Sequence, residues 1–182
     1  NNNPYVKITI IRVLFLSEVL MISIDFSSLT IYSPFTGELH PIDDTPDEVF
    51  SSKVTGDGFC VFPSKGEVTA PTSGTITYVF DTNHALVLHD TNGVEYLLHI
   101  GIDTIRLGGR GFTIHVAEGD TVTRGDTLLT FDRELLHCEG YSDVCVCAFT
   151  DLDDTVEVAP VTVRDVNATD PAVQIVYRKD CE

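Results

Sequence analysis

From Leu29 onward, short apolar runs rich in Val, Ile, Thr, Phe and Tyr alternate with turns that contain Gly, Asp, Asn or Pro. This spacing is typical of many short β-strands, and patterns of helical period are scarce. Strands this short must form a sandwich or barrel to bury their apolar faces and protect their edges. The sequence therefore predicts an all-β fold, an antiparallel β-sandwich or distorted barrel with little helix. The expected strands lie at 29–32, 58–63, 66–69, 74–80, 85–89, 95–100, 113–116, 127–131, 144–149 and 172–177, and a short helical turn is expected at 132–137.

Two short internal sequence repeats indicate that the fold has quasi-repeated halves. Ser-Pro-Phe-Thr-Gly at 33–37 resembles Ala-Pro-Thr-Ser-Gly at 70–74, and the turn Gly-Asp at 119–120 recurs at 125–126. Glycine supplies the positive φ that such turns need, and an aliphatic residue two positions after each aspartate returns to the core. The alternative is chance recurrence of common turn dipeptides.

The 182 residues suffice for one domain with a sizeable core but not for two ordinary ones. Residues 1–28 are predicted to be an N-terminal extension of unclear role, and residues 29–182 the domain itself. Charged side chains interrupt the apolar run at 6–26, so it holds neither an uncharged membrane-spanning stretch nor a clear secretory signal. The single methionine, Met21, is a candidate native start. An amphipathic anchor at a membrane surface is the alternative role for this stretch.

The chain is strongly acidic, with a formal net charge of -17 and a pI near 4.4. Nucleic-acid binding needs clusters of Lys and Arg, and the 11 present here are scattered, so no nucleic-acid partner is expected. An acidic surface favours a basic protein partner that is steered by long-range attraction. The alternative is that the charge serves only solubility.

The five cysteines, at 60, 138, 145, 147 and 181, include no C-x-x-C pair. Cys145 and Cys147 alternate within an expected strand, so they should point to one face. We expect reduced, small apolar side chains rather than a metal or redox site, which implies a reducing compartment.

One predicted hairpin carries two histidines. Asn92-Gly93 lies between two apolar runs, which is the strongest short-range signal for a tight turn. With a two-residue loop, Leu86 lies opposite His99, and His84 is diagonal to His99 on the same face. A four-residue loop would place His84 directly opposite His99. Only a loop with an odd number of residues would put the two histidines on different faces.

Paired imidazoles at the end of an apolar hairpin suggest phosphoryl-transfer chemistry. A neutral imidazole is nucleophilic at physiological pH, and a second imidazole can donate a hydrogen bond to a charged group on the first. Phosphoryl transfer needs little else, because positioning and charge stabilisation dominate it. The alternative is two unrelated surface or core histidines. No specific role is expected for His40, His89, His115 or His137.

A series of motifs surrounds these histidines, and their order and spacing are specific although each alone is weak. The strongest is Leu98-His99-Ile100-Gly101-Ile102-Asp103-Thr104. The others are Ser33-Pro34-x-x-Gly37, Pro46-Asp47-x-Val49-Phe50, Gly56-Asp57-Gly58, Ala70-Pro71-x-x-Gly74, Thr82-Asn83-His84-Ala85, Gly93-Val94-Glu95, and Leu107, Gly109, Gly111 and Phe112. From about residue 31 to 178 the sequence resembles the glucose-type enzyme IIA domains of the bacterial phosphoenolpyruvate-dependent sugar phosphotransferase system.

The resemblance implies a function and roles for several residues. A small histidine phosphocarrier protein would donate a phosphoryl group to His99, and the group would pass to a cysteine or another residue of a sugar-specific IIB domain. His84 would hold the phosphoryl oxygens, and Thr82 would orient His84. Gly101 would offer a backbone carbonyl that fixes the His99 tautomer. The resemblance implies a cytoplasmic phosphotransferase component with no metal or other cofactor, which meets the membrane only through the sugar permease.

The resemblance also implies a docking face around His99, where an apolar centre rimmed by carboxylates suits a basic partner. Its residues would be Asp47, Val49, Phe50, Gly101 and Asp103. We expect Val49 and Phe50 to form an exposed apolar patch beside His99. Arg110 departs from the pattern, because this turn usually carries an acidic residue. The stretch 137–170 fits loosely.

Two other functions compete with this interpretation. A zinc peptidase of related barrel fold needs His-x-x-x-Asp, a spacing found at His40 and at His99, together with His-x-His, which the sequence lacks. A biotinyl or lipoyl carrier needs a lysine at a hairpin tip. Lys65 could lie at such a tip, but the flanking motif is absent.

Overall fold

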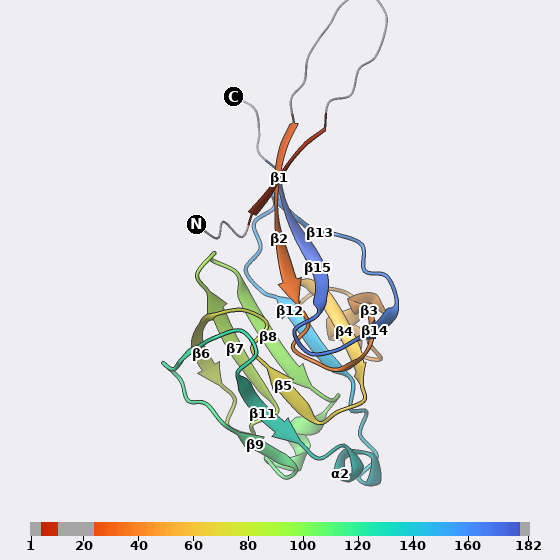
Figure 1. The fold of residues 1–182 in the computed structure, drawn as a ribbon. Coiled ribbons are helices and arrows are strands. Elements are labelled where there is room, and N and C mark those ends of the chain that lie inside the picture. Colours follow the sequence, from red (N-terminus) through yellow and green to blue (C-terminus); the bar gives the residue numbers. More distant parts are fainter. Residues whose placement is uncertain (1–4, 11–23, 179–182) are drawn as a thin grey trace, which may run out of the picture.

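The computed structural model describes residues 5–10 and 24–178, and most of its regular structure is β-strand (Figure 1). All ten predicted strands overlap observed strands, and the predicted turn at 132–137 overlaps an α-helix. The helices are α1 (Glu48–Ser51), α2 (Arg133–Cys138), and the 3-10 helices η1 (Ile42–Asp44) and η2 (Thr104–Leu107). The strands are β1 (Tyr5–Ile10), β2 (Ile24–Tyr32), β3 (Gly37–Pro41), β4 (Asp57–Pro63), β5 (Glu67–Thr69), β6 (Gly74–Val79), β7 (Ala85–Asp90), β8 (Glu95–Ile100), β9 (Phe112–Ile114), β10 (Thr121–Val122), β11 (Thr127–Phe131), β12 (Cys145–Phe149), β13 (Val156–Val158), β14 (Arg164–Val166) and β15 (Pro171–Arg178).

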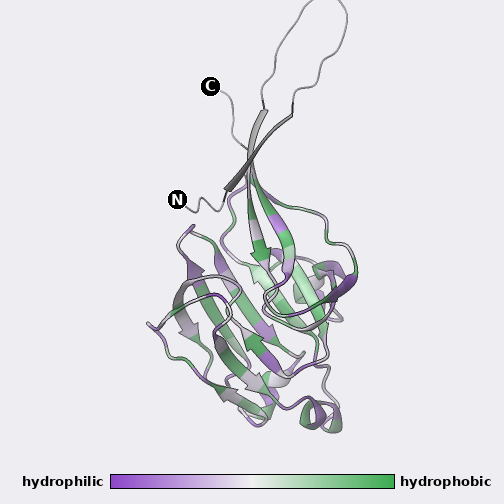
Figure 2. Ribbon diagram, viewed as in Figure 1, coloured by the Kyte–Doolittle hydropathy of each residue, from purple (hydrophilic) through white to green (hydrophobic). Residues whose placement is uncertain are grey.

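The described strands form three sheets with antiparallel pairing. The largest has the order β10-β6-β7-β8-β12-β4-β3-β14, and the others are β1-β2-β15-β13 and β5-β11-β9. One apolar core joins the three sheets, since Ile31 of β2, Leu98 of β8 and Leu129 of β11 all belong to it. Figure 2 shows the hydrophobic residues running along these strands. The fold is an open antiparallel β-sandwich with little helix, as the sequence predicts.

The central strands of the eight-stranded sheet bury both of their faces. On β12, Cys145 and Cys147 point into the main core, as expected, whereas Val146 and Ala148 belong to a second, smaller apolar cluster. Cys60 joins that second cluster from β4, Cys138 is exposed, and Cys181 lies outside the described residues. Two-sided burial makes these strands continuous apolar runs and places the second cluster on the sheet's outer face.

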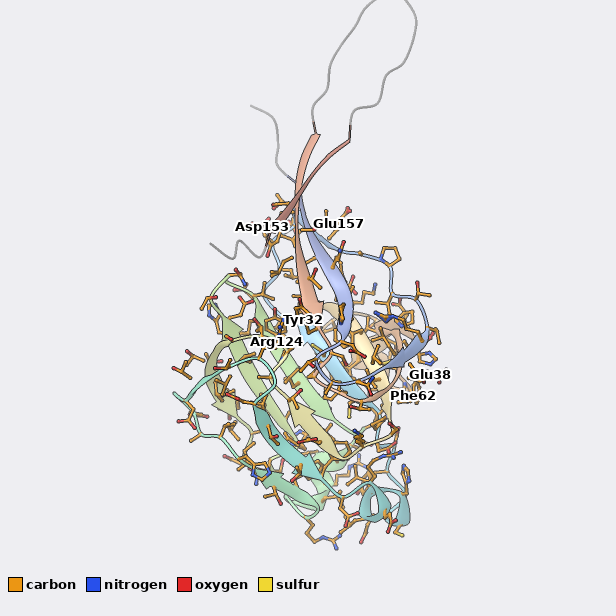
Figure 3. The ribbon with its side chains drawn as sticks, viewed as in Figure 1. Tyr32, Glu38, Phe62, Arg124, Asp153 and Glu157 are labelled. Carbon is orange, nitrogen blue, oxygen red and sulfur yellow. The ribbon has the colours of Figure 1, made fainter. Side chains whose placement is uncertain are left out.

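The internal sequence repeats coincide with a repeated set of backbone hydrogen bonds. Ala70 exchanges two such bonds, of 2.8 and 2.9 Å, with the turn at 125–126. Ser33 exchanges two bonds of 2.8 Å with the turn at 169–170, where Thr169 occupies the place of Gly125. In both turns the aspartate carboxylate accepts from the backbone N–H three residues earlier. This repetition supports quasi-repeated halves. Arg124 of the first turn lies 4.0 Å from the centroid of the Tyr32 ring (Figure 3).

The hairpin between β7 and β8 differs from the prediction. Asp90 N–H donates to the Val94 carbonyl, so the loop at 91–93 has three residues, and Gly93 takes a positive φ of 88°. The sequence predicts a two-residue loop, with a four-residue loop as the alternative, and the structure has neither. Ala85, rather than Leu86 or His84, is therefore the residue opposite His99.

The predicted N-terminal extension lies partly outside the described residues, as does Met21. β2 begins at Ile24, before the predicted boundary at residue 29, and β1 pairs with it from Tyr5 to Ile10. Within the residues that the structure describes, no helix is long and apolar enough to cross a membrane.

The repeated turns predict opposite effects of matched substitutions. Thr169 has a φ of 73° and Gly125 a φ of 94°, and left-handed backbone costs a side-chain-bearing residue about 1–2 kcal/mol. We expect Thr169→Gly to leave the unfolding free energy unchanged or raise it by up to about 1 kcal/mol, since glycine also gains unfolded-state entropy. Gly125→Ala should lower it by about 1–2 kcal/mol. Urea unfolding measures both, and a loss from Thr169→Gly equal to that from Gly125→Ala would contradict the matched roles of the turns.

Candidate functional site

The candidate site lies on the outer face of the eight-stranded sheet, around His99. On β8, His99 has Ala85 of β7 opposite it on one side and Val146 of β12 on the other. Phe50 of α1 covers it from above the sheet, with ring centroids 5.0 Å apart. The surroundings of His99 on this face are therefore largely apolar.

His84 reaches His99 because it stands just outside β7. Its carbonyl accepts from Ile100 N–H at 2.9 Å, but Asn83 before it takes a left-handed φ of 55°, so strict strand alternation ends there. The two imidazole centroids lie 4.9 Å apart with their planes at 89°. The structure thus brings the predicted pair together although the predicted register is wrong.

A tight turn holds His84 in place. Asn83 N–H donates to the Phe80 carbonyl at 2.7 Å, and Thr82 Oγ1 lies 2.6 Å from His84 Nδ1. The Phe80 ring packs against the imidazole at 5.5 Å between centroids. His84 is only 3% exposed. With Nδ1 bound to the hydroxyl, Nε2 is the nitrogen left to meet a ligand.

His99 is anchored differently. Its Nδ1 is buried, and among the described residues it has no hydrogen-bond partner of normal geometry. The turn after β8 requires glycine, because Gly101 has a φ of 73° and a Cβ there would lie 2.8 Å from the Ser142 carbonyl oxygen. Thr104 Oγ1 donates to the Ile100 carbonyl at 2.6 Å and closes this turn. Since Nδ1 is buried in a partly exposed residue, Nε2 is the nitrogen available for chemistry.

Both imidazoles favour the neutral form. Burial and, after it, the nearby His84 lower the pKa of His99 to about 4, against the opposing effect of a hydrogen bond to the Gly101 backbone. Burial also lowers the pKa of His84. A neutral imidazole has a lone pair on one nitrogen and a proton on the other. The pair can therefore offer one nucleophilic nitrogen and one N–H donor at pH 7.

Two comparisons with known proteins bear on this site. Residues 29–155 match the family described as the phosphoenolpyruvate-dependent sugar phosphotransferase system, EIIA 1. The fold is similar to glucose permease IIA from Mycoplasma capricolum, with a TM-score of 0.73 and 32% sequence identity over 81% of this chain and 95% of that chain.

The chain belongs to this EIIA family.

It is a phosphocarrier component of a sugar phosphotransferase system, which agrees with the resemblance seen in the sequence. The two competing functions find no support in the EIIA fold. Among the residues described, no three potential ligands group as a metal site, and His40 Nδ1 bonds Asp44 directly at 2.9 Å. Lys65 lies between β4 and β5, which belong to different sheets, so it is not at a hairpin tip.

The residues expected on the docking face of this EIIA domain separate into two groups. Val49 is 51% exposed, and the side chain of Asp103 is 57% exposed with its carboxylate 3.5 Å from Arg106. Phe50 is only 7% exposed, so the expected exposed patch of Val49 and Phe50 is wrong for Phe50. Asp47 is partly buried and caps α1, where it accepts from two backbone N–H groups.

Three further residues near the EIIA site were not predicted from the sequence. Phe80 packs on His84, and its position two residues before Thr82 in an apolar run was the available signal. Ile105 of η2 is 55% exposed and adds an apolar side chain just beyond β8. Glu139 pairs with Arg110 at 3.1 Å, so the unusual basic residue of the rim is locally neutralised.

The lowered pKa of His99 predicts a specific dependence of stability on pH. Folding shifts this pKa from 6.5 to about 4, so the unfolded chain binds more protons between these values. Above pH 6.5 this histidine costs the fold nothing, and as the pH falls toward 4 the penalty for burying a group that would otherwise be protonated lowers the unfolding free energy. Relative to His99→Gln, the unfolding free energy of the parent should fall by up to about 1.4 kcal/mol per pH unit in this window. Urea unfolding at several pH values tests this, with the exposed His89→Gln as control. Parallel curves for parent and His99→Gln would contradict it.

Proposed function

We propose that this EIIA domain accepts a phosphoryl group on His99 Nε2 from a histidine phosphocarrier protein and passes it to a IIB domain for sugar uptake and phosphorylation. The observation that carries the proposal is the His84–His99 pair, with ring centroids 4.9 Å apart and both Nδ1 atoms sequestered. Two Nε2 atoms are thereby left for one phosphoryl group, one as acceptor and one as hydrogen-bond donor.

Acceptance requires His99 to be neutral with its proton on Nδ1. Its Nε2 lone pair attacks the phosphorus of the donor's phosphohistidine. The N–P bond to the donor breaks as the new N–P bond forms, and the donor imidazole leaves with the electron pair. Burial favours this neutral form at pH 7, and the low local dielectric strengthens later contacts to the phosphoryl charge.

His84, oriented by Thr82, stabilises the transferred group. If the Thr82 hydroxyl donates to Nδ1, the proton of neutral His84 must reside on Nε2, which then donates to a phosphoryl oxygen. Such a fixed donor needs no reorganisation when charge develops on the transferred oxygens. In the second transfer, a cysteine thiolate or other nucleophile of the IIB domain attacks phosphorus, and the His99 imidazole leaves with the electron pair.

Both partners would approach over Val49, Ile105 and Asp103. The two apolar side chains are more than half exposed, and exposed apolar groups edged by charge mark docking surfaces. The net charge of -17 would speed encounter with a basic donor. The reaction would take place in the cytoplasm, where the described free cysteines persist as thiols. The membrane would be met only through the permease that carries the IIB domain.

The decisive experiment is phosphorylation of His99→Gln. Incubation with phosphoenolpyruvate and the two general phosphotransferase proteins should add one acid-labile phosphoryl group to the parent chain and none to the variant, because glutamine has no nucleophilic lone pair. Intact-mass spectrometry measures the addition. The control is His89→Gln, an exposed histidine on β7, which should be labelled like the parent. Labelling of His99→Gln would overturn the assignment.

A second variant separates acceptance from onward transfer. His84→Gln should still be phosphorylated, since glutamine keeps one donor near the phosphoryl group. It should deliver the group to a IIB domain about 100-fold more slowly, the usual effect of losing one stabilising donor. The measurement is the single-turnover transfer rate from the prephosphorylated protein. Delivery at the parent rate would show that His84 has no part in the transfer.

A further inference from the structure

The helix that carries Phe50 is too short to be stable by itself, and hydrogen bonds hold both of its ends. The Asp47 carboxylate accepts from Val49 N–H at 2.9 Å and from Phe50 N–H at 3.3 Å. At the other end, Lys53 N–H donates to the Phe50 carbonyl at 2.9 Å. The Lys53 ammonium also reaches Asp57 on β4 at 3.2 Å. A four-residue helix anchored in this way holds Phe50 in a fixed direction.

That direction is toward the sheet, not toward solvent. Phe50 is 7% exposed and belongs to the second apolar cluster, with Val146 and Cys60 of the sheet's outer face. Its ring lies 5.0 Å from the His99 ring at an interplanar angle of 57°. The neighbouring residue Val49 is 51% exposed, so adjacent positions of α1 have opposite surroundings.

The two imidazoles of the site are fixed by different means. His84 has a hydrogen bond to Thr82 at 2.6 Å and the Phe80 ring beside it. His99 has the Phe50 ring and a contact with the Gly101 backbone, but in the described part of the chain its Nδ1 lacks a hydrogen bond of normal geometry. The Phe50 ring therefore adds, by packing, to the orientation of His99 that the contact with the Gly101 backbone leaves incomplete.

We propose that Phe50 is a positioning residue that fixes the His99 imidazole and shields it from water, and that Asp47 acts through Phe50 by capping α1. This inference rests on the proposed function only in taking the positioned His99 to be the phosphoryl acceptor. It differs from the docking role that the sequence suggests for Asp47 and Phe50, because neither residue needs to touch a partner.

The covering ring has an electrostatic consequence. The titratable group that acts on His99 by its charge is His84, and the contacts from α1, β7 and β12 are Phe50, Ala85 and Val146, which are uncharged. Removal of the Phe50 ring would admit water and raise the pKa of His99 from about 4 toward 6.5. The acid limb of the phosphorylation rate would then move to higher pH, because protonated His99 has no lone pair on Nε2.

The experiment compares Phe50→Ala and Asp47→Ala with the matched variants Asp47→Asn and Val49→Ala. NMR titration gives the pKa of His99, and steady-state kinetics with the donor protein give kcat and KM. We expect Phe50→Ala to raise the pKa and to lower kcat roughly tenfold or more, since small misplacements of a reacting group are costly. Asp47→Ala should also raise the pKa of His99 and lower kcat, each by less than Phe50→Ala does. It provides the test if Phe50→Ala fails to fold.

Asp47→Asn should behave like the parent, because asparagine is an equally good cap, whereas Val49→Ala should raise KM without moving the pKa. A docking role would give the opposite pattern: an unchanged pKa and kcat with a raised KM in Phe50→Ala and in Asp47→Asn. That pattern would overturn the inference. If the parent chain were not phosphorylated on His99, the proposed function would fail, while the NMR titrations would still decide whether Phe50 controls the imidazole.

Discussion

The buried carboxylate of Asp90 sets the register on which the histidine pair depends. It accepts hydrogen bonds from Asn92 N–H, Asn92 Nδ2, Val94 N–H and the Tyr96 hydroxyl, at 2.7 to 3.1 Å. These bonds close a three-residue loop and place Ala85 opposite His99. A methyl group at that position leaves room beside the imidazole, which a leucine in the expected register would fill. A polar interaction at one end of the hairpin thus controls the space available at the other.

Much of the fold follows from the sequence because the central strands carry an unambiguous pattern, as at β8 and β12. Two of the elements missed, β14 and α1, have a weak local pattern. β14 has two exposed polar residues out of three, and α1 is too short to show a helical period. The inward direction of Phe50 depends on the cap at Asp47, and no periodicity reveals it.

The two histidine rings meet as predicted, although the predicted register of the hairpin is wrong. Alternation over an odd loop would send His84 and His99 to opposite faces of the hairpin. His84 does not follow this alternation, because β7 begins one residue later and Asn83 takes a left-handed conformation. Pattern rules apply within a strand, whereas functional side chains often stand just beyond its end. The spacing alone places the two histidines at the same end of the hairpin. The turn at Asn83 then decides that their rings meet.

The absence of a carboxylate from the described surroundings of His99 suits the role proposed for it, in which the imidazole both accepts and releases a phosphoryl group. His40, on the same sheet, shows the alternative: Asp44 lies 2.9 Å from its Nδ1 and Glu38 3.3 Å from its Nε2, and its pKa is raised. An imidazole held in that way favours its charged form, which has no lone pair with which to attack phosphorus. A carboxylate at Nδ1 alone would make Nε2 more basic, and a more basic nitrogen leaves phosphorus less readily in the second transfer. A neutral imidazole held by packing and by the backbone avoids both effects, so the apolar surroundings of His99 favour the proposed transfer in either direction.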